Sequence, residues 1–109
     1  MKIVNRKTFL ELPNNILFCE FDPNIFGDFC IKTRTLENDF CYISLMDFND
    51  DGSSKYGCYD IFDASLEKGV IVPLDLDIEN RDGCFDDNQL FAVFDANDIN
   101  SLINKLKTL

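Results

Sequence analysis

The chain has 109 residues, and its 20 acidic and 10 basic side chains give a formal net charge of −10 at pH 7. A hydrophobic fraction of 46% and an aromatic fraction of 13% exclude a disordered acidic tail, and the length predicts one compact domain over residues 1–109. The sequence contains no histidine, which excludes Ser–His and Cys–His nucleophile pairs and histidine-based metal sites within one chain.

The beginning of the chain predicts a short helix and a strand. Asn5 is a good N-cap for a helix over residues 5–12, and Pro13 then ends that helix. Residues 16–21 form an apolar run of strand length, and residues 22–24 carry the chemistry of a turn.

The next segment predicts an antiparallel hairpin. Its strands are residues 26–34 and 40–46, which are rich in aromatic and branched side chains and are joined by a polar turn. In the first strand the apolar Phe29 and Ile31 alternate with the charged Lys32 and Arg34, a pattern typical of a half-exposed strand. We therefore expect Lys32 and Arg34 on its exposed side.

A polar loop and a middle helix follow the hairpin. The loop covers residues 47–54. Tyr59, Phe62 and Leu66 then recur at helical spacing, and Gly69 suits the position just after the end of a helix.

Two further strands are expected between residues 70 and 94. Pro73 makes the first half of residues 70–78 an edge or a loop, because proline cannot donate a backbone hydrogen bond. The second half alternates apolar residues with Asp75 and Asp77, which predicts a strand with both carboxylates on one face. Residues 89–94 form another apolar run of strand length.

The last element has the strongest local signals of the chain. Asp95 is an N-cap, and Asp98 occupies the position where the acid of a capping box lies. A core-facing stripe of helical period follows, made of Ile99, Leu102, Ile103 and Leu106. Altogether the pattern predicts an α+β domain with a mostly antiparallel sheet, a short N-terminal helix, a middle helix and a C-terminal amphipathic helix.

The cysteines indicate reduced thiols. Their number is odd and no C-x-x-C pair occurs, which argues against a disulfide framework, a zinc ribbon and a thioredoxin-type site. The five are Cys19, Cys30, Cys41, Cys58 and Cys84. Together with the absence of a signal-peptide-like apolar run, they predict a cytoplasmic protein.

One loop partly matches a calcium site. Asp47, Asn49, Asp51 and Gly52 fit the first six positions of an EF-hand loop, with oxygen ligands at three of them. Cys58 stands where a bidentate glutamate should close the loop, and the same residues suit an ordinary polar turn. We therefore expect no cofactor and no metal here, with Asp47, Asn49 and Asp51 as a weak calcium candidate.

The negative charge lies in the later part of the chain. Residues 1–36 carry five basic and four acidic side chains, whereas residues 37–109 carry five basic and sixteen acidic ones. This balance argues against direct binding of nucleic acid or an anionic membrane and favours a partner protein with a basic surface. The predicted partner-binding residues, called here the acidic stretch, are Asp75, Asp77, Glu79, Asp82, Asp86 and Asp87.

Paired carboxylates can also divide acid and base roles in catalysis. However, adjacent carboxylates on a strand point to opposite faces, and those on a loop stay hydrated. No catalytic residue is therefore predicted.

Several segments resemble a known group of proteins. They are residues 20–23 with 26–32, 38–42, 73–77 and 81–93, the last reading Arg-Asp-Gly-Cys-Phe-Asp-Asp-Asn-Gln-Leu-Phe-Ala-Val. The chain resembles a family of small uncharacterised proteins of tailed bacteriophages and prophages. The resemblance implies a phage or prophage origin and action in the cytoplasm of a bacterial host, and it supplies no catalytic residue.

These observations favour a small acidic interaction protein rather than an enzyme. The leading hypothesis is that it binds and inhibits a host nucleic-acid-binding or defence protein through its acidic surface. A non-enzymatic accessory role and a weak calcium-binding module remain as alternatives, because an acidic surface also serves solubility alone. The oligomeric state is left open.

Overall fold

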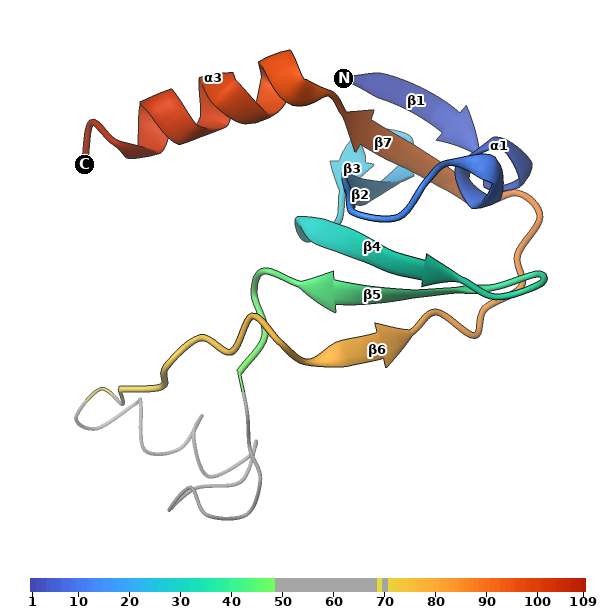
Figure 1. Cartoon of the computed structure of the whole chain (residues 1–109), viewed down its shortest axis with the longest axis horizontal. Helices are drawn as coiled ribbons and strands as arrows, with labels where there is room; N and C mark the ends of the chain where they lie inside the picture. Colours follow the sequence, from blue (N-terminus) through green and yellow to red (C-terminus); the bar gives the residue numbers. More distant parts are fainter. Residues whose placement is uncertain (49–68, 70) are drawn as a thin grey trace.

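The computed structural model describes residues 1–48, 69 and 71–109. In this part of the chain a seven-stranded sheet with the order β1-β7-β2-β4-β5-β6 is accompanied by two helices, and β3 pairs with β2 (Figure 1). The strands are β1 (Lys2–Asn5), β2 (Ile16–Asp22), β3 (Ile25–Phe26), β4 (Cys30–Thr35), β5 (Phe40–Ser44), β6 (Glu79–Arg81) and β7 (Leu90–Phe94), and the helices are α1 (Arg6–Glu11) and α3 (Ala96–Leu106). All strand pairs are antiparallel, so the predicted α+β class is confirmed.

The predicted middle helix lies outside the described residues, since residues 49–68 and 70 are not among them.

The N-terminal helix is confirmed. The Asn5 side chain accepts a hydrogen bond of 2.8 Å from the backbone N–H of Thr8, as an N-cap does. The strand before it, β1, was not predicted, because Val4 is its one buried residue and the segment carries no clear period.

A cluster of aromatic rings forms the core on one face of the sheet. Phe9 of α1 lies against Phe18 of β2, Phe40 of β5 and Phe91 of β7, with ring-centre distances of 4.8, 4.9 and 4.0 Å. All four are at most 1% exposed. Because α1 brings Phe9 onto this face, three strands far apart in the sequence share one core.

The hairpin is confirmed, but the predicted exposure of Lys32 is wrong. In β4 and β5, Lys32 pairs with Tyr42 and Arg34 pairs with Cys41, so one extra residue lies between Lys32 and Arg34. Such a bulge reverses the alternation of side chains and puts Lys32 and Arg34 on opposite faces. Lys32 is completely buried, while Arg34 stays exposed.

Lys32 is buried because the end of α1 needs donors. Its ammonium group donates to the backbone oxygens of Phe9 at 3.1 Å and Leu12 at 2.7 Å. Carbonyl groups at the end of a helix lack hydrogen-bond partners within the helix, and a lysine ammonium group can donate hydrogen bonds to them. Burial lowers the pKa of Lys32, so its charge is held against a desolvation cost.

The strand predicted in the second half of residues 70–78 does not form over the described residues 74–78, and β6 begins only at Glu79. The Asp75 side chain accepts a hydrogen bond from the backbone N–H of Asp77 at 2.9 Å. This local bond competes with pairing to a neighbouring strand. Leu74 and Leu76 are consequently 62% and 48% exposed rather than packed.

The C-terminal helix α3 has the predicted capping box, with reciprocal hydrogen bonds between Asp95 and Asp98. The apolar stripe faces the sheet as expected, because all four of its residues line one hollow between α3 and the sheet, but the stripe is not packed as a core. Ile99 and Leu102 are half-buried, but Ile103 and Leu106 are 43% and 64% exposed.

The direction of α3 explains this difference. The helix continues from the end of β7 and projects beyond the strands (Figure 1). A hollow of about 630 Å³ lies between the helix and the sheet face that carries Leu17, Phe29 and Ile31. The stripe of α3 therefore lies across this hollow from the sheet, and its packing becomes weaker toward the last turn.

Candidate functional site

A second hollow opens on the sheet face that holds the aromatic core. Its volume is about 500 Å³, and it lies beside Phe18, between the ends of β2, β4, β5 and β6. We call it the acidic pocket, lined by Phe18, Glu20, Gly27, Asp28, Cys30, Tyr42, Ser44, Met46, Asp47 and Asn80. None of these ten described residues is basic.

Aromatic side chains form the floor of the acidic pocket. Phe18 is 1% exposed, and the half-buried Tyr42 ring meets it edge-on at 6.3 Å between ring centres. Burial raises the pKa of Tyr42, and the nearby Cys30 and Glu20 contribute to the same shift. The hydroxyl group therefore stays protonated at neutral pH and is a potential hydrogen-bond donor.

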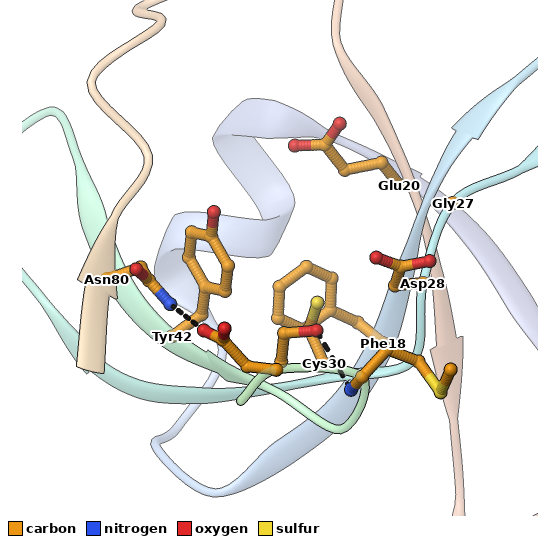
Figure 2. A pocket seen from close by; sticks show the side chains of 10 residues that line it. Phe18, Glu20, Gly27, Asp28, Cys30, Tyr42 and Asn80 are labelled. Carbon is orange, nitrogen blue, oxygen red and sulfur yellow. Dashed lines mark hydrogen bonds between the residues drawn. The ribbon is translucent and has the colours of Figure 1, made fainter. Parts of the chain in front are cut away.

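Glu20 stands at the rim of the acidic pocket. Its carboxylate accepts a 2.7 Å hydrogen bond from the Gln89 side chain. Desolvation raises the pKa of Glu20, although part of the side chain is exposed, and the negative charge of Asp82 raises it further. Figure 2 shows the carboxyl groups of Glu20 and Asp28 and the Tyr42 hydroxyl around one opening.

Asp28 and Asp47 reach the acidic pocket from two different connections. Asp28 follows Gly27, whose N–H donates to the backbone oxygen of Glu20 at 2.9 Å and so fixes this segment beside β2. Asp47 follows β5, and its carboxylate accepts a hydrogen bond of 3.3 Å from the Asn80 side chain of β6. Glu20, Asp28 and Asp47 are thus brought together only by the sheet, and no motif in the sequence links them.

The thiol of Cys30 in this site, and those of Cys19 and Cys84 outside its lining, are not activated. Burial raises the pKa of Cys30 to about 12, with Asp28 adding to the shift. Burial also raises the pKa of Cys19, while the charge of Asp82 raises that of Cys84. The thiolate is the nucleophilic form of cysteine, so these three thiols are poor nucleophiles at neutral pH.

The first two members of the acidic stretch lie next to the acidic pocket. The backbone N–H of Asp75 donates to the backbone oxygen of Asp47 at 2.9 Å, and Asp75 in turn holds Asp77 through its side chain. Asp75 and Asp77 therefore continue the negative charge of the acidic pocket outward, from a loop rather than from the predicted strand.

Asp82 is placed differently from the prediction. Its side chain is 3% exposed and forms a 2.9 Å ion pair with Arg6 of α1, instead of projecting from an exposed turn. Arg6 also reaches Asp39, which in turn accepts a 2.6 Å hydrogen bond from Arg81. Buried charges need such partners, and this requirement draws Asp82 inward.

The remaining members of the acidic stretch are separated as well. Glu79 pairs with Arg34 at 2.8 Å, on the opposite face of β6 from Asn80. Asp86 and Asp87 are exposed on the connection between β6 and β7. The acidic stretch therefore does not form one edge, because two of its members are engaged in ion pairs.

The weak calcium candidate is only partly described. Asn49 and Asp51 lie outside the described residues, and Asp47 belongs to the acidic pocket. Among the residues with described positions, no group of three Asp, Glu or Cys side chains could hold a metal ion.

Comparisons of the chain with protein-family models, with curated proteins and with solved structures gave no match. Neither helix in the described part of the chain is long and apolar enough to cross a membrane.

Proposed function

We propose that the protein is a small, non-enzymatic interaction protein that encloses a lysine or arginine side chain of a partner protein in the acidic pocket. The observation that carries this proposal is the composition of the pocket, where Glu20, Asp28 and Asp47 surround an aromatic floor. Carboxylates accept charge-assisted hydrogen bonds from ammonium and guanidinium groups, and aromatic ring faces attract the same cations.

The environment of Glu20 supports the same ligand. Its pKa is raised by desolvation and by Asp82, so ionisation costs more here than in an ordinary exposed glutamate. A cation beside Glu20 stabilises the ionised form. Cation binding and ionisation of Glu20 therefore favour each other.

The overall charge supports a partner with a basic surface. The formal net charge of −10 attracts such a protein over distance, and Asp75 and Asp77 extend the negative region beside the acidic pocket. Proteins that bind nucleic acid present basic sites for phosphate groups. On this proposal, with the phage resemblance, the target is a nucleic-acid-binding or defence protein in the host cytoplasm, which is inhibited when its basic site is occupied.

A matched pair of double variants tests the pocket. Glu20→Gln with Asp28→Asn removes two pocket charges, whereas Asp22→Asn with Glu11→Gln removes two exposed charges elsewhere. Each double variant is titrated with a short oligolysine peptide in a calorimeter. The dissociation constant should be at least about tenfold higher than that of the wild type for the pocket variant only. An equal loss for both double variants would mean that binding follows net charge and that the acidic pocket is not the site.

The inhibitory role is tested separately. A host protein retained by the wild-type chain is identified by mass spectrometry, purified and assayed for nucleic-acid binding. The wild-type chain should displace the nucleic acid, and the pocket double variant should do so much less well. Simultaneous binding of the chain and the nucleic acid to that protein would contradict inhibition at a phosphate site.

A further inference from the structure

An exposed phenylalanine has an unfavourable backbone conformation. Phe85 has a φ of 52°, and every other described residue with positive φ is a glycine or an asparagine. A bulky side chain in this left-handed region is strained. The residue is 53% exposed, so burial does not explain why phenylalanine occupies this position.

The surrounding loop is held firmly on both sides of Phe85. On one side Asp82 is fixed by its ion pair with Arg6, and the N–H of Gly83 donates to the Asp39 carboxylate at 3.1 Å. On the other side the N–H of Gln89 donates to the backbone oxygen of Asp86 at 3.1 Å. These contacts fix the backbone on both sides of Phe85, so the strained conformation persists. Strained residues held in this way are found at binding and active sites.

Phe85 borders two hollows of the surface. One has a volume of about 600 Å³ and is shared with Lys7 and Leu10, and the other has about 390 Å³ and is shared with Leu36 and Arg81. A ring at the border between two hollows is accessible to a partner from more than one side.

The charges around Phe85 indicate what kind of surface it meets. Asp86 and Asp87 follow it directly, and with Glu37 these exposed acids outnumber the exposed Lys7 and Arg81 that line the same hollows. Gln89, at the end of the same loop, donates to Glu20 at the rim of the acidic pocket. The loop and the acidic pocket are thus neighbouring parts of one surface.

We infer that Phe85 is an aromatic anchor that inserts into an apolar pocket of the partner protein, with basic side chains at the rim of that pocket facing Asp86 and Asp87. A few buried aromatic residues supply most of the binding free energy in many interfaces, and a side chain held in place beforehand loses little conformational entropy on binding. This inference rests on the proposed function, since it takes the partner to be a protein with a basic surface.

The test uses a probe with the chemistry expected of the partner. A β-cyclodextrin that carries a primary amine on each glucose unit offers an apolar cavity with a basic rim. Phe85→Gly should weaken its binding at least about tenfold, and Phe85→Asn, which also tolerates positive φ, should act in the same way. The matched control is Phe26→Ala, because Phe26 is 52% exposed and lies on β3, away from Asp86 and Asp87.

The melting temperature separates an anchor from a structural residue. Relief of the left-handed strain should leave the melting temperature of the Phe85→Gly variant unchanged or raised, while probe binding falls. A lowered melting temperature in both Phe85 variants would assign the ring a structural role and overturn the inference. Unchanged probe binding, or the same loss in Phe26→Ala, would overturn it as well. None of these outcomes depends on Glu20 or Asp28, so a failure of the acidic pocket is distinguished by the oligolysine titration.

Discussion

In the described part of the molecule the charged residues Arg6, Lys32 and Asp39 are buried, and so is the side chain of Asp82. Each has partners for its charge. Lys32 donates to carbonyl oxygens at the end of α1, whereas Arg6 and Asp39 lie in one network that also includes Asp82 and Arg81. No buried side-chain nitrogen or oxygen in this part of the chain lacks a hydrogen-bond partner.

Asp39 is the residue that joins this network. Burial alone would raise its pKa, but hydrogen bonds from Arg81 and from the backbone amides of Phe40 and Gly83 hold the pKa below its ordinary value. Asp39→Asn should lower the free energy of unfolding by about 1.5–3 kcal/mol, because it weakens charge-assisted hydrogen bonds to Arg81 and to the buried Arg6, which keeps its ion pair with Asp82. Urea denaturation at neutral pH measures this, with the exposed Asp22→Asn as the control. A loss no larger than that of the control would contradict it.

The same carboxyl contributes to the pH dependence of stability. A depressed pKa in the folded state means that the contribution is present above the unfolded value of about 3.9 and is lost as the pH falls through the folded value. The stability of the wild-type protein should therefore fall more steeply below about pH 4 than that of Asp39→Asn.

At the scale of elements, the two helices differ in how they are attached. Phe9 anchors α1 inside the aromatic core. α3 is attached at its beginning, where its first turn begins directly after β7 and Asp98 forms a 2.7 Å ion pair with the ammonium group of Met1. Its exposed last turns make little contact with the sheet.

This gradient along α3 gives a matched pair of substitutions. Leu102→Ala, at a half-buried position, should cost about 1–2 kcal/mol, which is less than the cost at a fully buried leucine. Leu106→Ala, at a position 64% exposed, should change stability by no more than about 0.5 kcal/mol. Thermal unfolding of both variants measures the difference. Equal losses at the two positions would show that α3 packs along its whole length.

At the scale of the whole molecule, the sheet concentrates negative charge beside an aromatic floor. The acidic pocket takes Glu20 from β2, Asp28 from the link between β3 and β4, and Asp47 from the segment after β5. At moderate salt, exposed charges separated by more than a Debye length of about 8–10 Å are screened from each other. The rate of association with a basic partner should therefore fall as the salt concentration rises.

Glu20 should make cation binding depend on pH. Its raised pKa means that its charge, and with it part of the affinity for an oligolysine peptide, is lost at a higher pH than the ordinary glutamate value of about 4.3. Glu20→Gln should bind more weakly at neutral pH and lack this component of the pH profile.

The effect of Glu20 on the pH dependence of folding stability is opposite to that of Asp39, because a raised carboxyl pKa lowers stability as the pH rises through it. Glu20→Gln should therefore be at least as stable as the wild type at pH 7, and a loss of stability there would contradict the assignment.

Local signals in the sequence were sufficient for much of the fold. The caps Asn5 and Asp95 act within three residues, and the β4–β5 hairpin depends on neighbouring segments, so each was predicted from composition and spacing. The caps work because a side chain reaches the free N–H groups of its own helix. The α+β class follows from the order of these elements.

Only the tertiary structure decided where the charged residues lie. Arg6 and Asp82 are 76 positions apart, and the bulge beyond Lys32 reverses an alternation that the sequence alone would extend. The same holds for the acidic pocket, whose carboxylates come from separate connections, and for Phe85, whose strain depends on a loop held by Asp39. A local pattern determines helix and strand through the backbone of adjacent residues. Pairing between distant charges depends instead on which strands the sheet brings together. A local sequence pattern does not show which distant segments become neighbours in space.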